Sequence, residues 1–327
     1  MNREQKDIVE LTLGMPRSEK QLNRLHESDA ELIEQSPGKV LAITTDTLIE
    51  EIEHGLYTDP HLIGWMAVTC CASDLAAVGA SPLGMVISAT FQKDYQGIQD
   101  IQKGIQEALS SYSLPLLGGD TNYAKGMSFT GTAMGCVENS PPLKRSGAKP
   151  GDILASTGFL GIGNLYAYQK LFGKGSEEVV YKPFARLQEG QILRSFASSA
   201  IDSSDGFFSS LEDMMGVNGM GFLIESEYEE ILYPLIVEKA AIPLPLFLAG
   251  HHGEYELVFT VPQDHWHALL EAGNHIGWRP KHIGRVVSTP GIHLKDRVLP
   301  FGIIRKTWND ASDNFEAYFN RLIELLV

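Results

Sequence analysis

Aspartates beside Gly, Ser or Thr recur along this chain where apolar segments end. Carboxylate oxygens are the ligands that hard cations such as Mg²⁺ take, together with the oxygens of substrate phosphates. Several of these aspartates brought to one place would form a site for a metal-bound nucleotide. A single one is more often a helix cap or turn residue, so the prediction depends on the group as a whole. Its members are Asp29, Asp46, Asp74, Asp120, Asp202 and Asp205.

Two segments of this group suit a bound ligand. Gly118-Gly119-Asp120-Thr121 allows close backbone approach, because two of its residues lack a Cβ atom. Asp202-Ser203-Ser204-Asp205-Gly206 places two carboxylates and two hydroxyls within one turn. The sequence has no GxxxxGK[ST] loop, no GxGxxG at a helix start, no HExxH and no GxSxG. The predicted chemistry therefore depends on carboxylates and cations, and nucleophilic hydrolysis has little support.

Composition limits the partners of this chain. It carries 26 Lys and Arg against 41 Asp and Glu, a formal charge of −15, which disfavours nucleic acids and anionic membranes. An acidic chain that handles phosphates needs divalent cations to mediate the contact. The three cysteines lack CxxC spacing and disulfide density, the first residues are polar, and no apolar run is long enough to span a bilayer. We expect a cytoplasmic protein.

The order of predicted elements suggests two domains, and 327 residues exceed the size of about 150 typical of one. A helical lead-in over 1–36 precedes alternating strands and helices, and Asp59-Pro60 predicts a helix start. A segment rich in Pro, Gly and Ser, 138–152, marks the boundary between domains 1–140 and 141–327. Predicted strands are 39–45, 83–91, 127–137 and 257–261, with another from residue 153, and predicted helices are 61–78, 95–112 and 187–199.

Five segments, in this order, resemble the thiamine-monophosphate kinase family. That family belongs to the superfamily of aminoimidazole ribonucleotide synthase, selenophosphate synthase and a hydrogenase maturation protein. The resemblance runs from about Asp29 to the C-terminus. A selenophosphate synthase is disfavoured because no Cys lies in the N-terminal glycine-rich position, and the maturation protein because Val327 ends the chain without a terminal cysteine. The segments are Thr44-Thr45-Asp46-Thr47-Leu48, Ser73–Ala80, Gly118-Gly119-Asp120-Thr121, Arg145–Asp152 and Ile201–Gly206.

The resemblance implies an α+β, two-domain aminoimidazole ribonucleotide synthase-like fold. The N-terminal domains would pair into a dimeric β-barrel, with ATP and Mg²⁺ near the interface of a homodimer. Implied metal ligands are Asp29, Asp46, Asp74, Asp202 and Asp205. Implied nucleotide contacts are Thr44, Thr45, Tyr112, Gly119, Asp120, Arg145 and Ser204, and we expect Asp120 and Asp205 to be catalytic.

At the positions where the family contacts its phosphate acceptor, this chain departs from the family pattern. Glu53 stands where the family places a substrate-contacting His, and Gly253 where it places a substrate-binding Glu. A glutamate facing an anionic acceptor would disfavour its binding, although a shift of one residue would return His54 to the pocket. Glu254 and Phe315 complete the expected acceptor contacts.

The first hypothesis is an ATP- and Mg²⁺-dependent phosphotransferase, most simply a thiamine-monophosphate kinase with a small-molecule phosphate acceptor. A related kinase or synthase acting on another small molecule, or an inactive nucleotide-binding dimer, remain the alternatives.

Overall fold

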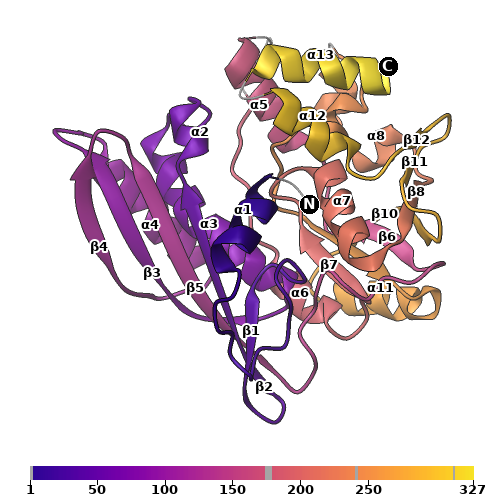
Figure 1. Ribbon diagram of the computed structural model, residues 1–327, viewed down its shortest axis with the longest axis horizontal. Helices are drawn as coiled ribbons and strands as arrows, with labels where there is room; N and C mark the ends of the chain where they lie inside the picture. Colours follow the sequence, from indigo (N-terminus) through magenta and orange to yellow (C-terminus); the bar gives the residue numbers. More distant parts are fainter. Residues whose placement is uncertain (1–2, 174–178, 240–241, 312–313) are drawn as a thin grey trace.

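Two β-sheets with flanking helices form the molecule in the computed structural model, which describes residues 3–173, 179–239, 242–311 and 314–327 (Figure 1). The first sheet has the strand order β1-β2-β5-β3-β4 and is open, with β1 and β4 as its edges. Its strands are β1 (Glu31–Ser36), β2 (Lys39–Leu48), β3 (Ser81–Gln92), β4 (Leu116–Ala124) and β5 (Ser128–Glu138).

The edge strand β4 is exposed along its whole length. It runs parallel to β3, to which α4 (Ile98–Ser111) connects it. Gly119 lies opposite Ile87, and a Cβ atom at Gly119 would come within 2.1 Å of the Ile87 carbonyl oxygen. The pairing of these two strands therefore requires glycine at this position, whatever else the residue does.

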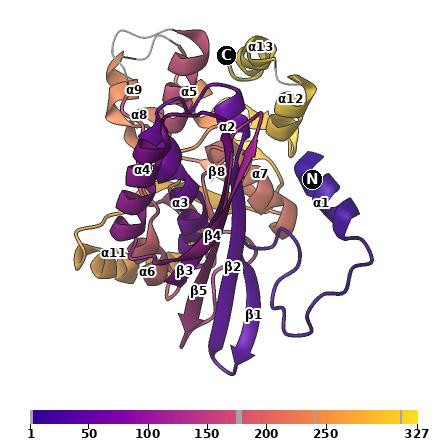
Figure 2. The ribbon, with the colours of Figure 1, turned by 90° about the vertical axis from the view of Figure 1, so that its left-hand side faces the viewer.

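Helix α3 (Pro60–Ala77) connects the two halves of the molecule. It begins as predicted, because the Asp59 side chain accepts a hydrogen bond from the His61 backbone N–H at 3.0 Å and Pro60 occupies the first turn. The helix is apolar on nearly all sides, since it packs on β2 and β5 and also on α6 (Leu187–Leu193) and β7 (Ser199–Asp202). Figure 2 shows α3 and α4 on one side of the first sheet.

The second sheet has the order β12-β11-β8-β10-β6-β9-β7. Its remaining strands are β6 (Ile153–Ser156), β8 (Gly221–Ile224), β9 (Leu257–Val261), β10 (Lys281–Val287), β11 (Ile292–His293) and β12 (Val298–Leu299). The other helices are α1 (Arg3–Thr12), α2 (Glu50–Glu53), α5 (Ile162–Phe172), α7 (Phe207–Asn218), α8 (Tyr228–Ile231), α9 (Pro234–Lys239), α10 (Leu246–Ala249), α11 (Trp266–Asn274), α12 (Ile303–Ala311) and α13 (Phe315–Leu326), with a 3₁₀ turn at Gln263–His265.

Some predicted elements require correction. The lead-in over 1–36 is helical only in α1, and it ends in β1, which pairs with β2. The helix predicted over 187–199 ends at Leu193, because Ser199 already begins β7. The Gly118-Gly119-Asp120-Thr121 segment, for which no strand was predicted, lies inside β4.

The implied closed barrel is not formed by one chain. The domain boundary predicted at 140 falls between β5 and β6, in a segment that carries Arg145.

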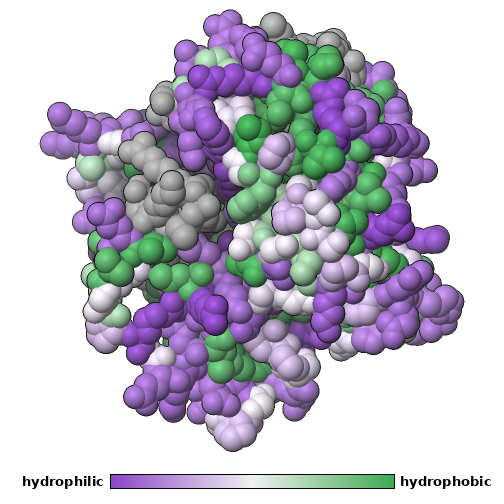
Figure 3. Space-filling model, turned by 45° about the vertical axis from the view of Figure 1, so that its right-hand side comes forward, coloured by the Kyte–Doolittle hydropathy of each residue, from purple (hydrophilic) through white to green (hydrophobic). Residues whose placement is uncertain are grey.

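Within the described ranges, we find no helix that is both long enough and apolar enough to cross a membrane. On the face in Figure 3, hydrophobic residues form a band bordered by hydrophilic ones.

Candidate functional site

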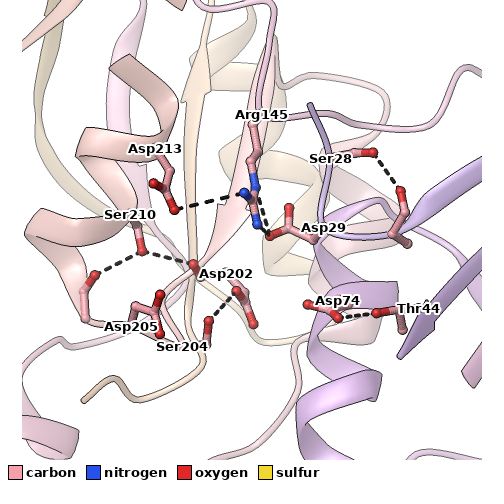
Figure 4. Close-up of polar contacts among 12 residues, drawn as sticks. Ser28, Asp29, Thr44, Asp74, Arg145, Asp202, Ser204, Asp205, Ser210 and Asp213 are labelled. Carbon is pink, nitrogen blue, oxygen red and sulfur yellow. Dashed lines mark hydrogen bonds and ion pairs between the residues drawn. The ribbon is translucent and has the colours of Figure 1, made fainter. Parts of the chain in front are cut away.

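Three predicted metal ligands converge from distant parts of the chain. Asp29 lies in the loop before β1, Asp74 on α3, and Asp202 at the end of β7. One carboxylate oxygen of each lies within 4.8 Å of the other two. In Figure 4 their side chains approach one another from the two halves of the molecule. We call this group the three-carboxylate cluster.

Burial sets the electrostatics of the cluster. The pKa of Asp74 lies well above its usual value because the group is desolvated and faces the charges of Asp202, Asp46 and Asp29. Burial and the charge of Asp29 raise the pKa of Asp202 to about 7. Oδ2 of Asp29 and Oδ2 of Asp202 are buried without a hydrogen-bond partner. Close, desolvated oxygens of this kind fit a divalent cation, which would replace the protons that the cluster otherwise holds.

Arg145 borders the cluster. Its Nη2 and Nε donate to Oδ1 of Asp29 at 2.9 and 3.3 Å, which leaves Asp29 Oδ2 free for another ligand (Figure 4). Both halves of the molecule fix the Arg145 backbone: its N–H donates to the Glu27 carbonyl, and its carbonyl accepts from Asn218 Nδ2, each at 2.8 Å. Arg145 also lines a cavity of about 720 Å³, so a phosphate can reach a fixed guanidinium there.

Hydroxyl groups orient two of the cluster carboxylates. Thr44 Oγ1 donates to Asp74, and Ser204 Oγ donates to Oδ1 of Asp202 at 3.0 Å. Thr45, next along β2, is exposed and its hydroxyl donates to the Gly131 carbonyl. These contacts restrict the rotation of the carboxylates before any ligand binds.

A second cavity, of about 390 Å³, adjoins the cluster; we call it the acceptor cleft. Its volume lies in the range of small-molecule sites. Burial raises the pKa of Asp46 to about 6 and that of Glu51 to about 7. The lining includes Thr45, Asp46, Glu51, His54, Ser204, Asp205, His251, His252, Trp308 and Phe315.

Aromatic rings form one wall of the acceptor cleft. The Trp308 ring lies 4.5 Å from that of His251 and 6.1 Å from that of Phe315, between centroids. The Phe315 ring meets His54 edge-on at 5.0 Å. Burial lowers the pKa of His251 and His252 to about 4, so both are neutral at pH 7. This wall suits a planar heterocycle, including a cationic one.

The acceptor contacts predicted from sequence are only partly in the cleft. Glu53 is exposed and absent from the lining, whereas His54 belongs to it, as a one-residue shift would give. Gly253 packs so closely that a Cβ atom would lie 1.4 Å from the Ser203 carbonyl oxygen. Glu254 is only 4% exposed and accepts hydrogen bonds from the Gly161 N–H and the Ser203 hydroxyl. Gly253 and Glu254 therefore hold the fold together behind the cleft and do not face it.

Three predicted nucleotide contacts lie away from the three-carboxylate cluster. Tyr112 is 4% exposed, and its hydroxyl pairs with Thr69 and accepts from the Ala185 N–H. Gly119 and Asp120 are exposed on β4, outside both cavity linings. One chain alone does not bring them to the site.

Sequence reasoning missed Arg305, which pairs with Asp205, and Asp213, which pairs with the same arginine. Arg305 on α12 donates from Nη1 to Oδ2 of Asp205 and from Nη2 to Oδ2 of Asp213, both at 2.6 Å. Burial alone would raise the pKa of Asp205, but the charge of Arg305, helped by His251, holds it well below its usual range. Asp213 lies on α7, next to Glu212. No spacing or motif marks Arg305.

Comparison with known proteins identifies relatives of this chain. Residues 27–137 match the family model described as AIR synthase related protein, N-terminal domain. A thiamine-monophosphate kinase of Pyrococcus abyssi is 32% identical over 261 residues, which cover 78% of this chain and 81% of the relative. This chain belongs to the thiamine-monophosphate kinase family. A second member, from Escherichia coli K12, is 32% identical over 262 residues, covering 76% of this chain and 79% of its own.

Solved structures extend the likeness to both halves of this family member. The protein tt0281 from Thermus thermophilus aligns with a TM-score of 0.78 and 26% identity, covering 90% of this chain and 97% of that one. AaThiL, solved in complex with AMPPCP and TMP, aligns with a TM-score of 0.73 and 22% identity over 89% and 92% of the two chains. The fold is thus mixed α+β and of the AIR synthase type.

Proposed function

We propose that this chain transfers the terminal phosphoryl group of ATP to the phosphate of thiamine monophosphate, giving thiamine diphosphate and ADP. The observation that carries the proposal is the buried three-carboxylate cluster, bordered by Arg145 and linked to the acceptor cleft by Ser204, which lines the cleft and donates to Asp202. The names of the relatives support it, as does a structural neighbour that binds AMPPCP and TMP together.

The arrangement suits direct transfer. An oxygen of the acceptor phosphate attacks the γ-phosphorus, the bond from that phosphorus to the β,γ-bridging oxygen breaks, and ADP leaves with the electron pair. Mg²⁺ held by Asp29, Asp74 and Asp202 would neutralise charge on the phosphates. Arg145, in the lining of the larger cavity, would hold a nucleotide phosphate, and Asp46 lines the acceptor cleft. The chain contributes positioning and charge, with no covalent intermediate.

The aromatic wall of the acceptor cleft suits the rest of the acceptor. Thiamine monophosphate carries a pyrimidine and a cationic thiazolium ring, and Trp308 and Phe315 offer faces for them. A cation over such a ring gains about 0.5–2 kcal/mol. The neutral histidines His251 and His252 add no opposing charge at pH 7.

We also propose that the active form is a homodimer. Leu116, Leu117 and Tyr123 of β4 are 51%, 57% and 68% exposed, and the strand leaves one edge unpaired. Such an edge is a template for pairing with another chain. Pairing through residues 1–140 would cover these side chains, close the barrel and carry Gly119 and Asp120 toward the interface, while residues 141–327 form the second domain.

The described structure leaves its three cysteines, Cys70, Cys71 and Cys136, as free thiols. Free thiols support our proposal of a reducing compartment, the cytoplasm.

A product assay tests the proposed function. The purified chain is incubated with ATP, Mg²⁺ and thiamine monophosphate, and thiamine diphosphate is separated by chromatography. We expect product with thiamine monophosphate, and none with thiamine or with EDTA in place of Mg²⁺. ATP binding without any product would contradict the proposal and favour another acceptor or an inactive nucleotide-binding dimer.

A further inference from the structure

Five side chains of alternating charge connect the three-carboxylate cluster to the acceptor cleft. Asp29 pairs with Arg145 at 2.9 Å, and Arg145 approaches Asp213 at 4.0 Å. Asp213 pairs with Arg305 at 2.6 Å, and Arg305 pairs with Asp205 at 2.6 Å. Each arginine thus lies between two carboxylates. Arg305 pairs with Asp213 and Asp205, the two carboxylates that lie outside the cluster.

Contacts with α7 fix the position of Arg305. Its side chain is 8% exposed. Glu212 accepts hydrogen bonds from the N–H groups of Ile304 and Arg305, both at 2.9 Å, and so fixes the first turn of α12 on α7. The neighbouring Asp213 then holds the guanidinium itself. Two consecutive acids of α7 therefore set both the backbone and the side chain of Arg305.

A metal ion does not fit Asp205 as it fits the cluster. Among the residues that the structure describes, Asp29, Asp74 and Asp202 form the group of three carboxylates close enough to share an ion, and Asp205 is not part of it. Oδ2 of Asp205 already accepts from the guanidinium, and a divalent cation beside it would repel Arg305. Asp29 differs, because its second oxygen stays buried and unpartnered next to two further carboxylates.

We propose that Arg305 is the resident cation of Asp205 and Asp213, standing where the family resemblance implies a further metal ion. The site then holds one metal ion fewer than its aspartates suggest, and α12 supplies fixed positive charge on the acceptor side. The inference rests on the proposed function only for the identity of the nucleotide.

The number of bound metal ions tests this. Equilibrium dialysis of the whole chain against Mn²⁺ and AMPPCP gives the count for the native protein and for three variants. We expect Arg305→Gln to bind one Mn²⁺ more per chain, because Asp205 loses its cation and Asp213 keeps only the more distant Arg145. Arg305→Lys should keep the native count. Arg321→Gln removes an arginine 3.9 Å from Asp310 and 44% exposed on α13, and should also keep it.

Two further variants leave Arg305 in place. Asp205→Asn should leave the Mn²⁺ count unchanged, whereas Asp74→Asn should lower it by at least one. Loss of an ion in Asp205→Asn, or an unchanged count in folded Arg305→Gln, would overturn the inference. Neither result depends on turnover, so failure of the product assay is a separate outcome.

Discussion

Two groups of carboxylates in this molecule look alike in the sequence and differ in charge balance. Asp29, Asp74 and Asp202 crowd together with raised pKa values, two of their oxygens unpartnered. Asp205, three residues after Asp202, has a lowered pKa because an arginine already neutralises it. A motif of aspartates therefore predicts that positive charge is needed, but the packed structure decides whether a metal ion or a side chain provides it.

Asp74→Asn should have the largest effect. Loss of the central carboxylate should lower kcat/KM about 100- to 1,000-fold, the usual cost of removing a group that organises transition-state charge. The metal-free protein should melt at a higher temperature near pH 7, because burial and neighbouring carboxylates force Asp74 to take up a proton on folding, and Asn avoids that cost.

Steady-state kinetics and thermal melts in EDTA check both effects of Asp74→Asn. The exposed Asp264→Asn is the matched control. A variant that keeps full activity and melts lower than the native protein would show Asp74 to be a structural residue.

Arg145→Met should have the second-largest effect. It leaves Asp29 buried beside no cation, which should destabilise the fold by about 3 kcal/mol. Loss of a charged phosphate contact should lower kcat/KM for ATP about 10- to 100-fold. Urea unfolding and kinetics measure the two effects, with Arg145→Lys as the charge-preserving control. Equal losses in both variants would mean that guanidinium geometry matters more than charge.

The stabilisation by Mg²⁺ should depend on pH. The folded pKa values of Asp46 and Asp202, about 6 and about 7, exceed the unfolded value of about 4, so without metal these groups lose native-state stability as pH rises between those values. Mg²⁺ replaces the protons, so the difference in melting temperature between Mg²⁺ and EDTA should be small at pH 5 and grow through pH 7. His251 and His252, whose pKa values are lowered, contribute to stability with the opposite pH dependence. Their contribution is the same in Mg²⁺ and in EDTA, so it cancels in the difference between the two melting temperatures. A constant difference would contradict carboxylate binding.

Phe315→Ala should act on the acceptor. Loss of one aromatic face should raise the KM for thiamine monophosphate about 5- to 10-fold, with kcat nearly unchanged. Tyr233→Ala, which removes an aromatic ring that is 41% exposed and outside the cleft, is the control. A change confined to kcat would contradict a binding role.

Glu53→Gln should have the smallest effect, below about twofold, because the side chain is exposed and outside the cleft. His54→Gln, its neighbour in the lining, should raise the KM for the acceptor more. The reverse order would restore the sequence-based expectation that Glu53 faces the acceptor.

Local signals account for what the sequence predicted well. Asp59-Pro60 and the long apolar run after it predict helix α3 and its cap. A short apolar run predicts strand β9. Strand β1 was not predicted, because its sequence is mostly polar and Leu32 is its one fully buried residue. No strand was predicted over Gly118-Gly119-Asp120-Thr121, because glycine disfavours strands, yet pairing with β3 overrides that preference.

Tertiary contacts account for what it missed. Arg305 lies 100 residues from Asp205, in a segment without a motif, so only the docking of α12 on α7 joins them. Whether Glu53 or His54 faces the cleft depends on the rotation of α2, a helix of four residues, too short for a periodic signal. The cluster of Asp29, Asp74 and Asp202 could be predicted only through the family resemblance, because residues so far apart in the sequence share no spacing that indicates contact.

Calorimetric titration of the native chain with AMPPCP, in Mg²⁺ and in EDTA, tests the central claim most directly. If buried carboxylates hold the nucleotide through divalent cations, affinity should fall at least about 100-fold in EDTA, a loss of about 2.7 kcal/mol. Equal affinity in both buffers would contradict the account, because the nucleotide would then be bound by the chain's own cations, with the three-carboxylate cluster playing no part.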